Sequence, residues 1–212
     1  MQIAVLGTGV VGRTLAPALA AAGHEVVVGT RDPAATKARD DWTLDLPLKA
    51  YDGVAEGADV VINATNGQVA LTALGAVGAQ ALAGKVLLDV SNPLDFSQGF
   101  PPTLTVKDTD SVAEQIQRAF PDALVAKTLN TVNCQVMVDP GRAGDGSSTM
   151  FVASDHAQAR TVARQLLEGF GWRDIIEFEE LNAARGMEMW LPLWVRLMGR
   201  LGTPDFNLKI VR

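Results

Sequence analysis

The sequence predicts an α/β protein built on a doubly wound, mostly parallel sheet with a small C-terminal helical extension. Short apolar runs alternate with helix-like segments along nearly the whole chain, which is typical of βαβ units. The first of these runs leads directly into a glycine-rich turn of the form G-x-G-x-x-G. The length of 212 residues fits one large domain, so this alternation describes the chain as a whole.

The composition argues against several classes of protein. Hydrophobic residues make up 48% of the chain and charged residues 20%, which excludes a disordered chain. The formal net charge of −6 argues against a nucleic-acid partner. One cysteine and two histidines argue against a disulfide framework and a metal site. The N-terminus lacks signal-peptide features and no apolar run is long enough for a membrane span, so we expect a cytoplasmic protein without a membrane partner.

The glycine-rich turn lies inside a complete βαβ unit. Residues 2–6 and 25–29 read as buried strands, and a helix-like segment ending at Gly23 separates them. In a Rossmann-type dinucleotide site, Gly7 permits the tight turn, Gly9 lets a pyrophosphate approach, and Gly12 brings the helix close to the strand. The free N–H groups of the first helical turn then bind phosphate. A plain strand–helix turn is the alternative interpretation.

The end of the second strand indicates which cofactor the site prefers. NAD-binding domains usually place Asp or Glu here, whereas this chain has Thr30 and Arg31. A hydroxyl and a guanidinium suit a 2′-phosphate, and Lys37 lies one turn further on. Asp32 is read as a helix N-cap. We therefore predict NADP(H) as the cofactor, with solvated Arg31 and Lys37 side chains as the alternative.

The remaining elements continue the alternation of strands and helices. Leu44 to Leu46 form a weak strand, and Ser111 with Glu114 forms a capping box for a helix. We expect a loop over 95–109 and a mobile glycine-rich loop over 141–148. The other predicted strands are 59–63, 85–89, 123–127, 149–153 and 172–178, and the helices are 51–56, 68–82, 111–119, 155–168 and 179–199. We predict a single domain over 1–212, with a dinucleotide-binding core to about residue 150 and an extension that walls the substrate pocket.

Polar turns follow three of the predicted strands, where doubly wound sheets bind their ligands. The first turn contains Ala64, Thr65 and Asn66, the second Asn92 and Pro93, and the third runs from Thr128 to Cys134. Ordinary turn chemistry would account for the same residues. The amides predicted to surround a nicotinamide are those of Asn66, Asn92, Asn130 and Asn133.

These motifs together resemble the NADPH-dependent deazaflavin reductases, also called coenzyme F420:NADP oxidoreductases. The resemblance rests on Gly7 through Gly12, on Gly23 through Arg31, on Asn92-Pro93 and on the ending from Trp190 through Lys209. It covers nearly the whole chain, and its first third is shared with the reductase domain of membrane ferric reductases. Two departures lie on the substrate side: Asn130 stands where the family often has histidine, and Asn66-Gly67 where it often has proline and an aromatic residue.

The resemblance implies NADP(H), coenzyme F420 as a co-substrate, and hydride transfer between them. It places Thr8, Gly9, Val10 and Val11 at the pyrophosphate and ribose, and Thr30 with Arg31 at the 2′-phosphate. It places Asn66, Asn92, Pro93 and Cys134 beside the nicotinamide. Phe206 and Leu208 would contact the deazaflavin.

No pair or triad of side chains suggests acid–base catalysis, so we assign no catalytic residue. Hydride transfer between two cofactors needs few protonating groups; it depends on stacking the reacting rings and excluding water. We expect a small-molecule redox substrate and a homodimer. Two alternatives stay open: an NADPH-dependent reductase of flavin, quinone, ferric chelate or imine, and a redox-sensing NADP-binding module without turnover.

Overall fold

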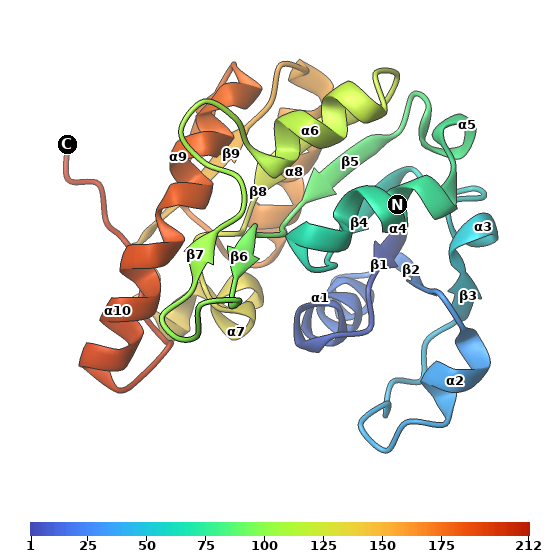
Figure 1. Cartoon of the computed structure of the whole chain (residues 1–212), viewed down its shortest axis with the longest axis horizontal. Helices are drawn as coiled ribbons and strands as arrows, with labels where there is room; N and C mark the ends of the chain where they lie inside the picture. The colour runs from blue at the N-terminus through green and yellow to red at the C-terminus, as the bar shows by residue number, and fades with distance from the viewer.

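The computed structural model describes all 212 residues and contains one eight-stranded sheet (Figure 1). Six strands follow the order of a Rossmann sheet, β3-β2-β1-β4-β5-β8, and all of their pairings are parallel. Strand β9 is antiparallel to β8, and β10 is parallel to β9. This confirms the predicted fold class. The strands are β1 (Gln2–Leu6), β2 (Glu25–Thr30), β3 (Leu48–Ala50), β4 (Val60–Asn63), β5 (Val86–Asp89), β8 (Leu124–Thr128), β9 (Thr149–Ala153) and β10 (Asp174–Phe178).

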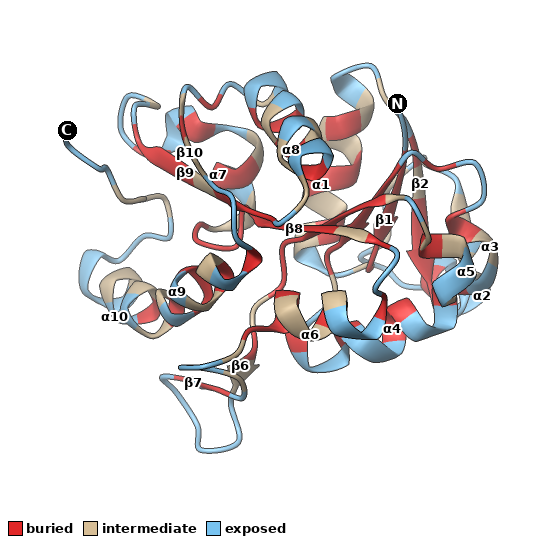
Figure 2. Ribbon diagram, turned by 90° about the horizontal axis from the view of Figure 1, so that it is seen from above, coloured by how far each residue is buried: buried red, intermediate tan, exposed pale blue.

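Helices cover both faces of the sheet, which leaves the central strands buried (Figure 2). Helices α1, α7 and α8 pack on one face and α3, α4 and α6 on the other. Strand β1 supplies Ile3 and Val5 to the first core and Ala4 and Leu6 to the second, which explains its continuous apolar sequence. The helices are α1 (Val10–Ala21), α2 (Pro33–Lys37), α3 (Tyr51–Val54), α4 (Ala70–Val77), α5 (Ala79–Leu82), α6 (Val112–Ala119), α7 (Cys134–Val138), α8 (Ala157–Gly169), α9 (Ala184–Met189) and α10 (Leu191–Leu201).

Several predicted boundaries are wrong. The third strand is β3 and not residues 44–46, because Leu48 to Ala50 pair with β2. The helix expected over 68–82 is broken at Gly78, whose φ of 95° is incompatible with an α-helix. The helix expected over 179–199 divides into α9 and α10, where Pro192 lacks the N–H that would continue the hydrogen-bond ladder. The loop expected over 95–109 contains a small hairpin of β6 (Leu94–Asp95) and β7 (Thr103–Leu104).

The C-terminal part of the chain is attached to the same sheet as the N-terminal part. Strands β9 and β10 extend the sheet beyond β8, and the tail after α10 returns to β9, where Thr149 N–H donates to Leu208 O at 2.9 Å. The last residues stay linked to this edge of the sheet, because Ile210 N–H donates to Thr149 Oγ1 at 2.9 Å and Arg212 donates to Asp174 Oδ1 at 2.8 Å. None of the helices combines the length and the apolar character that crossing a bilayer requires.

Candidate functional site

A cavity of about 710 Å³ opens at the carboxyl ends of β1, β4 and β5. The chain leaves β1 toward β2 on one side, while β4 lies on the other side of β1. Ligands of doubly wound sheets bind at such a reversal of strand order. The residues that were predicted to contact cofactor or substrate and that line this cavity are Val10, Val11, Ala64, Thr65, Asn66, Asn92, Asn133 and Cys134.

The glycine-rich loop between β1 and α1 has the geometry that its sequence predicts. Gly7 has a φ of 114°, and a Cβ there would lie 2.7 Å from Ala64 O. A Cβ on Gly12 would lie 2.0 Å from Gly7 O, so only glycine lets α1 approach the loop. A Cβ on Gly9 would meet nothing within 4 Å. The loop therefore packs tightly through Gly7 and Gly12 and leaves open space at Gly9.

Helix α1 begins directly behind this open space. Gly9 is its N-cap, and no side chain caps the first turn. Arg13 N–H makes the bond to Gly9 O at 3.0 Å, so the N–H groups of Val10 and Val11 precede the first helical hydrogen bond. Such groups at a helix start bind phosphate oxygens well.

Thr30, at the end of β2, is a predicted phosphate ligand whose hydroxyl is already hydrogen-bonded within the protein. Thr30 is buried, and its hydroxyl lies 2.8 Å from the Thr36 hydroxyl, which donates to Asp32 O. Because the Thr36 proton goes to Asp32 O, Thr30 donates to Thr36, and a bond from Thr30 to a phosphate would require this network to break. Asp32 Oδ1 accepts from Ala35 N–H at 2.9 Å, which confirms the predicted N-cap. Arg31 and Lys37 are exposed.

An arginine that sequence reasoning missed lies against the glycine loop. Arg39 donates to Thr8 Oγ1 at 2.9 Å and to both carboxylate oxygens of Asp41 at 2.8 Å. Arg13 also pairs with Asp41, at 2.7 Å. The hydrogen bonds from Arg39 hold the pKa of Asp41 below its usual value, and the same bonds raise the pKa of Arg39. We call Arg13, Arg39 and Asp41 the arginine cluster; it carries two positive charges and one negative charge.

The exits of β4 and β5 pack against each other beside the cavity. Gly67 N–H donates to Asn92 O at 3.2 Å, and a Cβ on Gly67 would lie 2.5 Å from that oxygen. Asn66 Oδ1 caps this turn by accepting from Gln68 N–H at 2.9 Å. Asn92 is held further by Asn130, because each side-chain amide donates to the other residue at 2.9 Å. Asn130 itself is buried behind Asn92 and does not line the cavity.

The C-terminal tail forms the opposite wall of the cavity. Trp194, from α10, lines the cavity and stacks on Phe206 with ring centroids 5.3 Å apart. Asp205 accepts from Asn133 Nδ2 at 2.9 Å and from Arg142 at 2.7 Å. These bonds fasten the tail to the N-cap of α7 and to the turn that follows this helix.

The structure separates two of the residues predicted to share the substrate pocket. Leu208 lines a second cavity of about 450 Å³, together with Phe151, Phe178 and Trp190, whereas Asn133 lines the main cavity. Phe206 lines neither cavity; it stacks on Trp194, which lines the main one. Pro93 supports the exit of β5 by accepting from Thr105 N–H at 2.8 Å and does not line the cavity.

Few ionisable side chains line the main cavity. They are Cys134, Arg142 and Asp205, and the last two form an ion pair. His156 lies at the start of α8, where its Nε2 is 3.0 Å from Gln117 Oε1. The cavity therefore offers amides, apolar side chains and an aromatic wall, which can orient a flat ligand and exclude water.

The chain matches the family model described as NADP oxidoreductase coenzyme F420-dependent over residues 2–93. It is 33% identical to the F420-dependent NADP reductase of Methanothermobacter marburgensis, over 93% of this chain and 92% of that protein. It is also 26% identical to rat Metalloreductase STEAP3, over 91% of this chain and 38% of that protein. Among solved structures, a putative F420-dependent NADP-reductase from Arthrobacter sp. FB24 superimposes with a TM-score of 0.97 and 53% identity, over the full length of both chains.

Proposed function

The chain belongs to the family of F420-dependent NADP reductases, and we propose that it transfers a hydride between the nicotinamide of NADP(H) and the deazaflavin of coenzyme F420. Membership of this family makes it an NADP-dependent oxidoreductase. The observation that carries the finer proposal is the continuity of the site. The open space at Gly9 adjoins Val10 and Val11, which line a cavity at the strand ends that Trp194 of α10 and the tail residues Pro204 and Asp205 also line.

The residues of this chain fit a dinucleotide. Gly9 leaves room for a pyrophosphate, and the N–H groups of Val10 and Val11 supply donors to it. The cavity of about 710 Å³ lies in the range of small-molecule sites and has room for a nicotinamide and part of a second flat ring. The bound nicotinamide supplies the hydride chemistry, and the protein orients the rings.

We assign the 2′-phosphate to the corner between the glycine loop and α2. Arg31 is a predicted ligand of this phosphate, and Arg39 joins it because Arg39 lies against the glycine loop, in contact with Thr8. The arginine cluster has a net positive charge, so an incoming phosphate would replace Asp41 as the partner of Arg39. Thr30 shapes this corner through Thr36.

Catalysis on this proposal is mainly positioning. The amides of Asn66 and Asn92 stand at the strand exits, while Trp194 and Cys134 line the side toward the tail and α7. Such an arrangement fixes the planes of two rings and keeps water away from the reacting carbons. None of these residues needs to donate or accept a proton in that role.

A homodimer also remains part of the proposal. Large apolar side chains are exposed on α10 and the tail, among them Leu193, Leu201 and Val211. A second copy of the chain would cover them. Sedimentation velocity over a range of protein concentrations tests this, and a mass near 22.4 kDa throughout would reject it.

A ferric-chelate reductase is the second candidate, and the match to Metalloreductase STEAP3 over most of this chain favours it. The test is to mix the protein with NADPH and, in separate reactions, coenzyme F420, a flavin, a quinone, an imine and a ferric chelate. We expect absorbance of the reduced nicotinamide to fall fastest with F420. Faster turnover of the ferric chelate would favour the second candidate. Tight NADPH binding without turnover of any acceptor would instead indicate a redox-sensing module.

The cofactor assignment has its own test in Arg31→Ala. Loss of a charged hydrogen bond should weaken NADPH binding by about 10-fold to 100-fold and leave NADH binding unchanged. Isothermal titration of both nucleotides measures this selectivity. An unchanged ratio of the two affinities would remove Arg31 from the phosphate site.

A further inference from the structure

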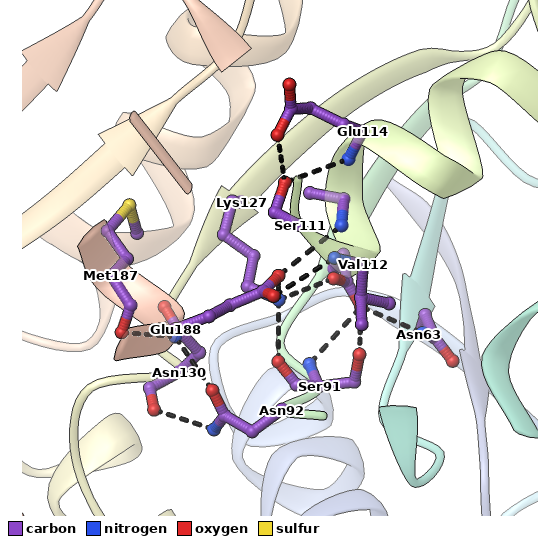
Figure 3. Close-up of polar contacts among 12 residues, drawn as sticks. Asn63, Ser91, Asn92, Ser111, Val112, Glu114, Lys127, Asn130, Met187 and Glu188 are labelled. Carbon is purple, nitrogen blue, oxygen red and sulfur yellow. Dashed lines mark hydrogen bonds and ion pairs between the residues drawn. The ribbon is translucent and has the colours of Figure 1, made fainter. Parts of the chain in front are cut away.

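Three neighbouring strands end in polar residues that form one row across the sheet. Asn63 on β4 is paired in register with Asp89 on β5, and Asp89 is paired with Lys127 on β8. All three are fully buried, with 0% of each residue exposed. Glu188, from α9, completes the group and is 1% exposed. We call Asp89, Lys127 and Glu188 the lysine cluster (Figure 3).

The ammonium of Lys127 has three N–H donors, and each has an acceptor. Asp89 Oδ2 lies 2.7 Å from Nζ, Glu188 Oε1 lies 2.7 Å away, and the backbone oxygen of Ser91 lies 2.6 Å away. Burial alone lowers the pKa of Lys127, but the two carboxylates outweigh burial and raise that pKa above its usual value. The side chain therefore stays charged, and its position is fixed by three bonds.

The carboxylates of the cluster are held equally closely. Asp89 Oδ1 accepts from Asn63 Nδ2 at 2.8 Å and from Ser91 Oγ at 2.7 Å. Glu188 accepts from Val112 N–H, in the first turn of α6, at 3.0 Å. That turn compensates the excess negative charge of two carboxylates around one ammonium. Burial raises the pKa of Glu188, and Lys127 offsets only part of this effect.

The cluster connects α9 to the wall of the main cavity. Lys127 holds the backbone of Ser91, and both Ser91 and Asn92 line that cavity. A second connection runs beside it: Asn130 Nδ2 donates to Met187 O at 3.0 Å and to Asn92 Oδ1 at 2.9 Å. Met187 and Glu188 are adjacent residues of α9, so two hydrogen-bonded connections, one through Asn130 and one through Lys127, link this helix to the exit of β5 (Figure 3).

Stability by itself is a weak reason for such a cluster, because replacing a buried ion pair with apolar side chains often leaves stability unchanged or higher. Apolar side chains in place of the lysine cluster would not hold the backbone of Ser91 in position, because they could not donate a hydrogen bond to it. A hydrogen bond from Lys127 sets the backbone oxygen of Ser91, and the following residue presents its side chain to the cavity.

We infer that Lys127 and Glu188 are positioning residues that set the Ser91–Asn92 wall against which the nicotinamide lies, so that the C-terminal extension determines the geometry of the cofactor site. This inference rests on the proposed NADP function. Neither side chain touches the cavity, so both act through Ser91 and Asn92.

The test compares two ligands that share the phosphate end of the cofactor. NADPH carries a nicotinamide, whereas 2′,5′-ADP has the adenosine and 2′-phosphate without it. The ratio of their affinities therefore reports the nicotinamide end alone. In Lys127→Gln we expect the advantage of NADPH over 2′,5′-ADP to fall by about fivefold to tenfold, the value of one mispositioned hydrogen bond. Affinity for 2′,5′-ADP should stay within about twofold.

Lys85→Gln is the matched control. Lys85 also donates to a backbone oxygen, that of Ala58 at 2.7 Å, but it precedes β5 at the opposite end of the sheet. The control removes one lysine-to-backbone hydrogen bond away from the cavity and should leave the affinity ratio unchanged. An equal change of the ratio in Lys85→Gln, or an unchanged ratio in Lys127→Gln, would overturn the inference.

If Lys127→Gln does not fold, Glu188→Gln takes its place. This variant leaves one ammonium paired with Asp89, so the buried charge is balanced, but it removes the charged link to α9. We expect the affinity ratio to fall by about twofold to threefold, and an unchanged ratio would overturn the inference. Failure of the wild type to bind either nucleotide would reject the proposed function itself, which separates the two outcomes.

Discussion

The arginine cluster and the lysine cluster join opposite charges at similar distances but differ in exposure and in net charge. In the arginine cluster the Asp41 side chain is 51% exposed and the Arg39 side chain 39% exposed. In the lysine cluster the exposed fractions of Asp89 and Lys127 are both 0%. Two guanidiniums outnumber one carboxylate in the first cluster, whereas two carboxylates outnumber one ammonium in the second.

Because of this difference, the carboxylate of the arginine cluster can be replaced by another anion, whereas the carboxylates of the lysine cluster cannot. Water screens the exposed pairs, so Asp41 can leave Arg39 at little cost when another anion arrives. Removing one member of the buried group instead leaves a charge without a partner in a medium that solvates it poorly. The first arrangement suits a ligand site, and the second suits a fixed support behind a ligand site.

The largest expected effect is on folding, in Lys127→Gln. Two buried carboxylates would then face each other without an ammonium, so we expect a loss of about 3–5 kcal/mol in the free energy of unfolding. Urea denaturation followed by circular dichroism measures it. The Lys85→Gln variant should lose only about 1 kcal/mol, the value of one hydrogen bond. Equal losses in the two variants would remove the contrast between buried and partly exposed lysines.

The next effect concerns cofactor binding, in Arg39→Ala. We expect NADPH affinity to fall by about 10-fold to 100-fold, because a charged donor to the 2′-phosphate is lost. NADH affinity and melting temperature should stay unchanged, since Arg39 lies at the surface. Arg118→Ala is the control, because Arg118, on α6, makes a similar surface pair with Asp110, which precedes that helix. A comparable loss of NADH affinity would show that Arg39 does not read the phosphate.

A smaller effect of opposite sign is expected in Asp41→Asn. Without the competing carboxylate, both guanidiniums are free for the phosphate, and NADPH should bind about twofold to fivefold more tightly. Titration at low salt maximises the effect, since salt screens exposed charges. Weaker NADPH binding would contradict the exchange model and indicate that Asp41 orients the arginines.

The smallest effect is a pH dependence at the tail. Asp174 accepts from Thr149 Oγ1 at 2.6 Å and from Lys209 and Arg212, and these bonds lower its pKa to about 2. A pKa below the unfolded value of 3.8 stabilises the fold above about pH 4, and this contribution disappears as the pH falls toward 2. Melting temperature between pH 5 and pH 2 should therefore fall more steeply in the wild type than in Asp174→Asn. Parallel curves would contradict this linkage.

The parts of the site that the sequence predicts well are those whose geometry depends on a few consecutive residues. Gly7, Gly9 and Gly12 act within one strand–turn–helix segment, and Asp32 caps the helix that follows it directly. Each of these roles depends on backbone geometry over a few residues. The Ser111 N-cap of α6 was predictable for the same reason, and Glu114 N–H donates to Ser111 Oγ at 3.2 Å.

Other parts of the site depend on contacts between distant segments. Arg39 is an ordinary loop residue by its neighbours, and only the fold brings it to Thr8. The sequence gives only a weak indication of the lysine cluster, which is that each of three apolar strands ends in a polar residue. Nothing in the sequence indicated that Glu188 would join them, since it lies in a segment expected to be one continuous helix.

The sequence by itself determined the fold class and the tight glycine turn after β1, because both follow from the alternation of apolar runs and from glycines that tolerate unusual or crowded backbone. Tertiary structure alone decided which charges are exposed and which are buried. That distinction depends on how the sheet, α6 and α9 pack around Lys127. The same chemical pairing of cation and carboxylate is exchangeable at Arg39 and permanent at Lys127, because only the fold removes water from the second.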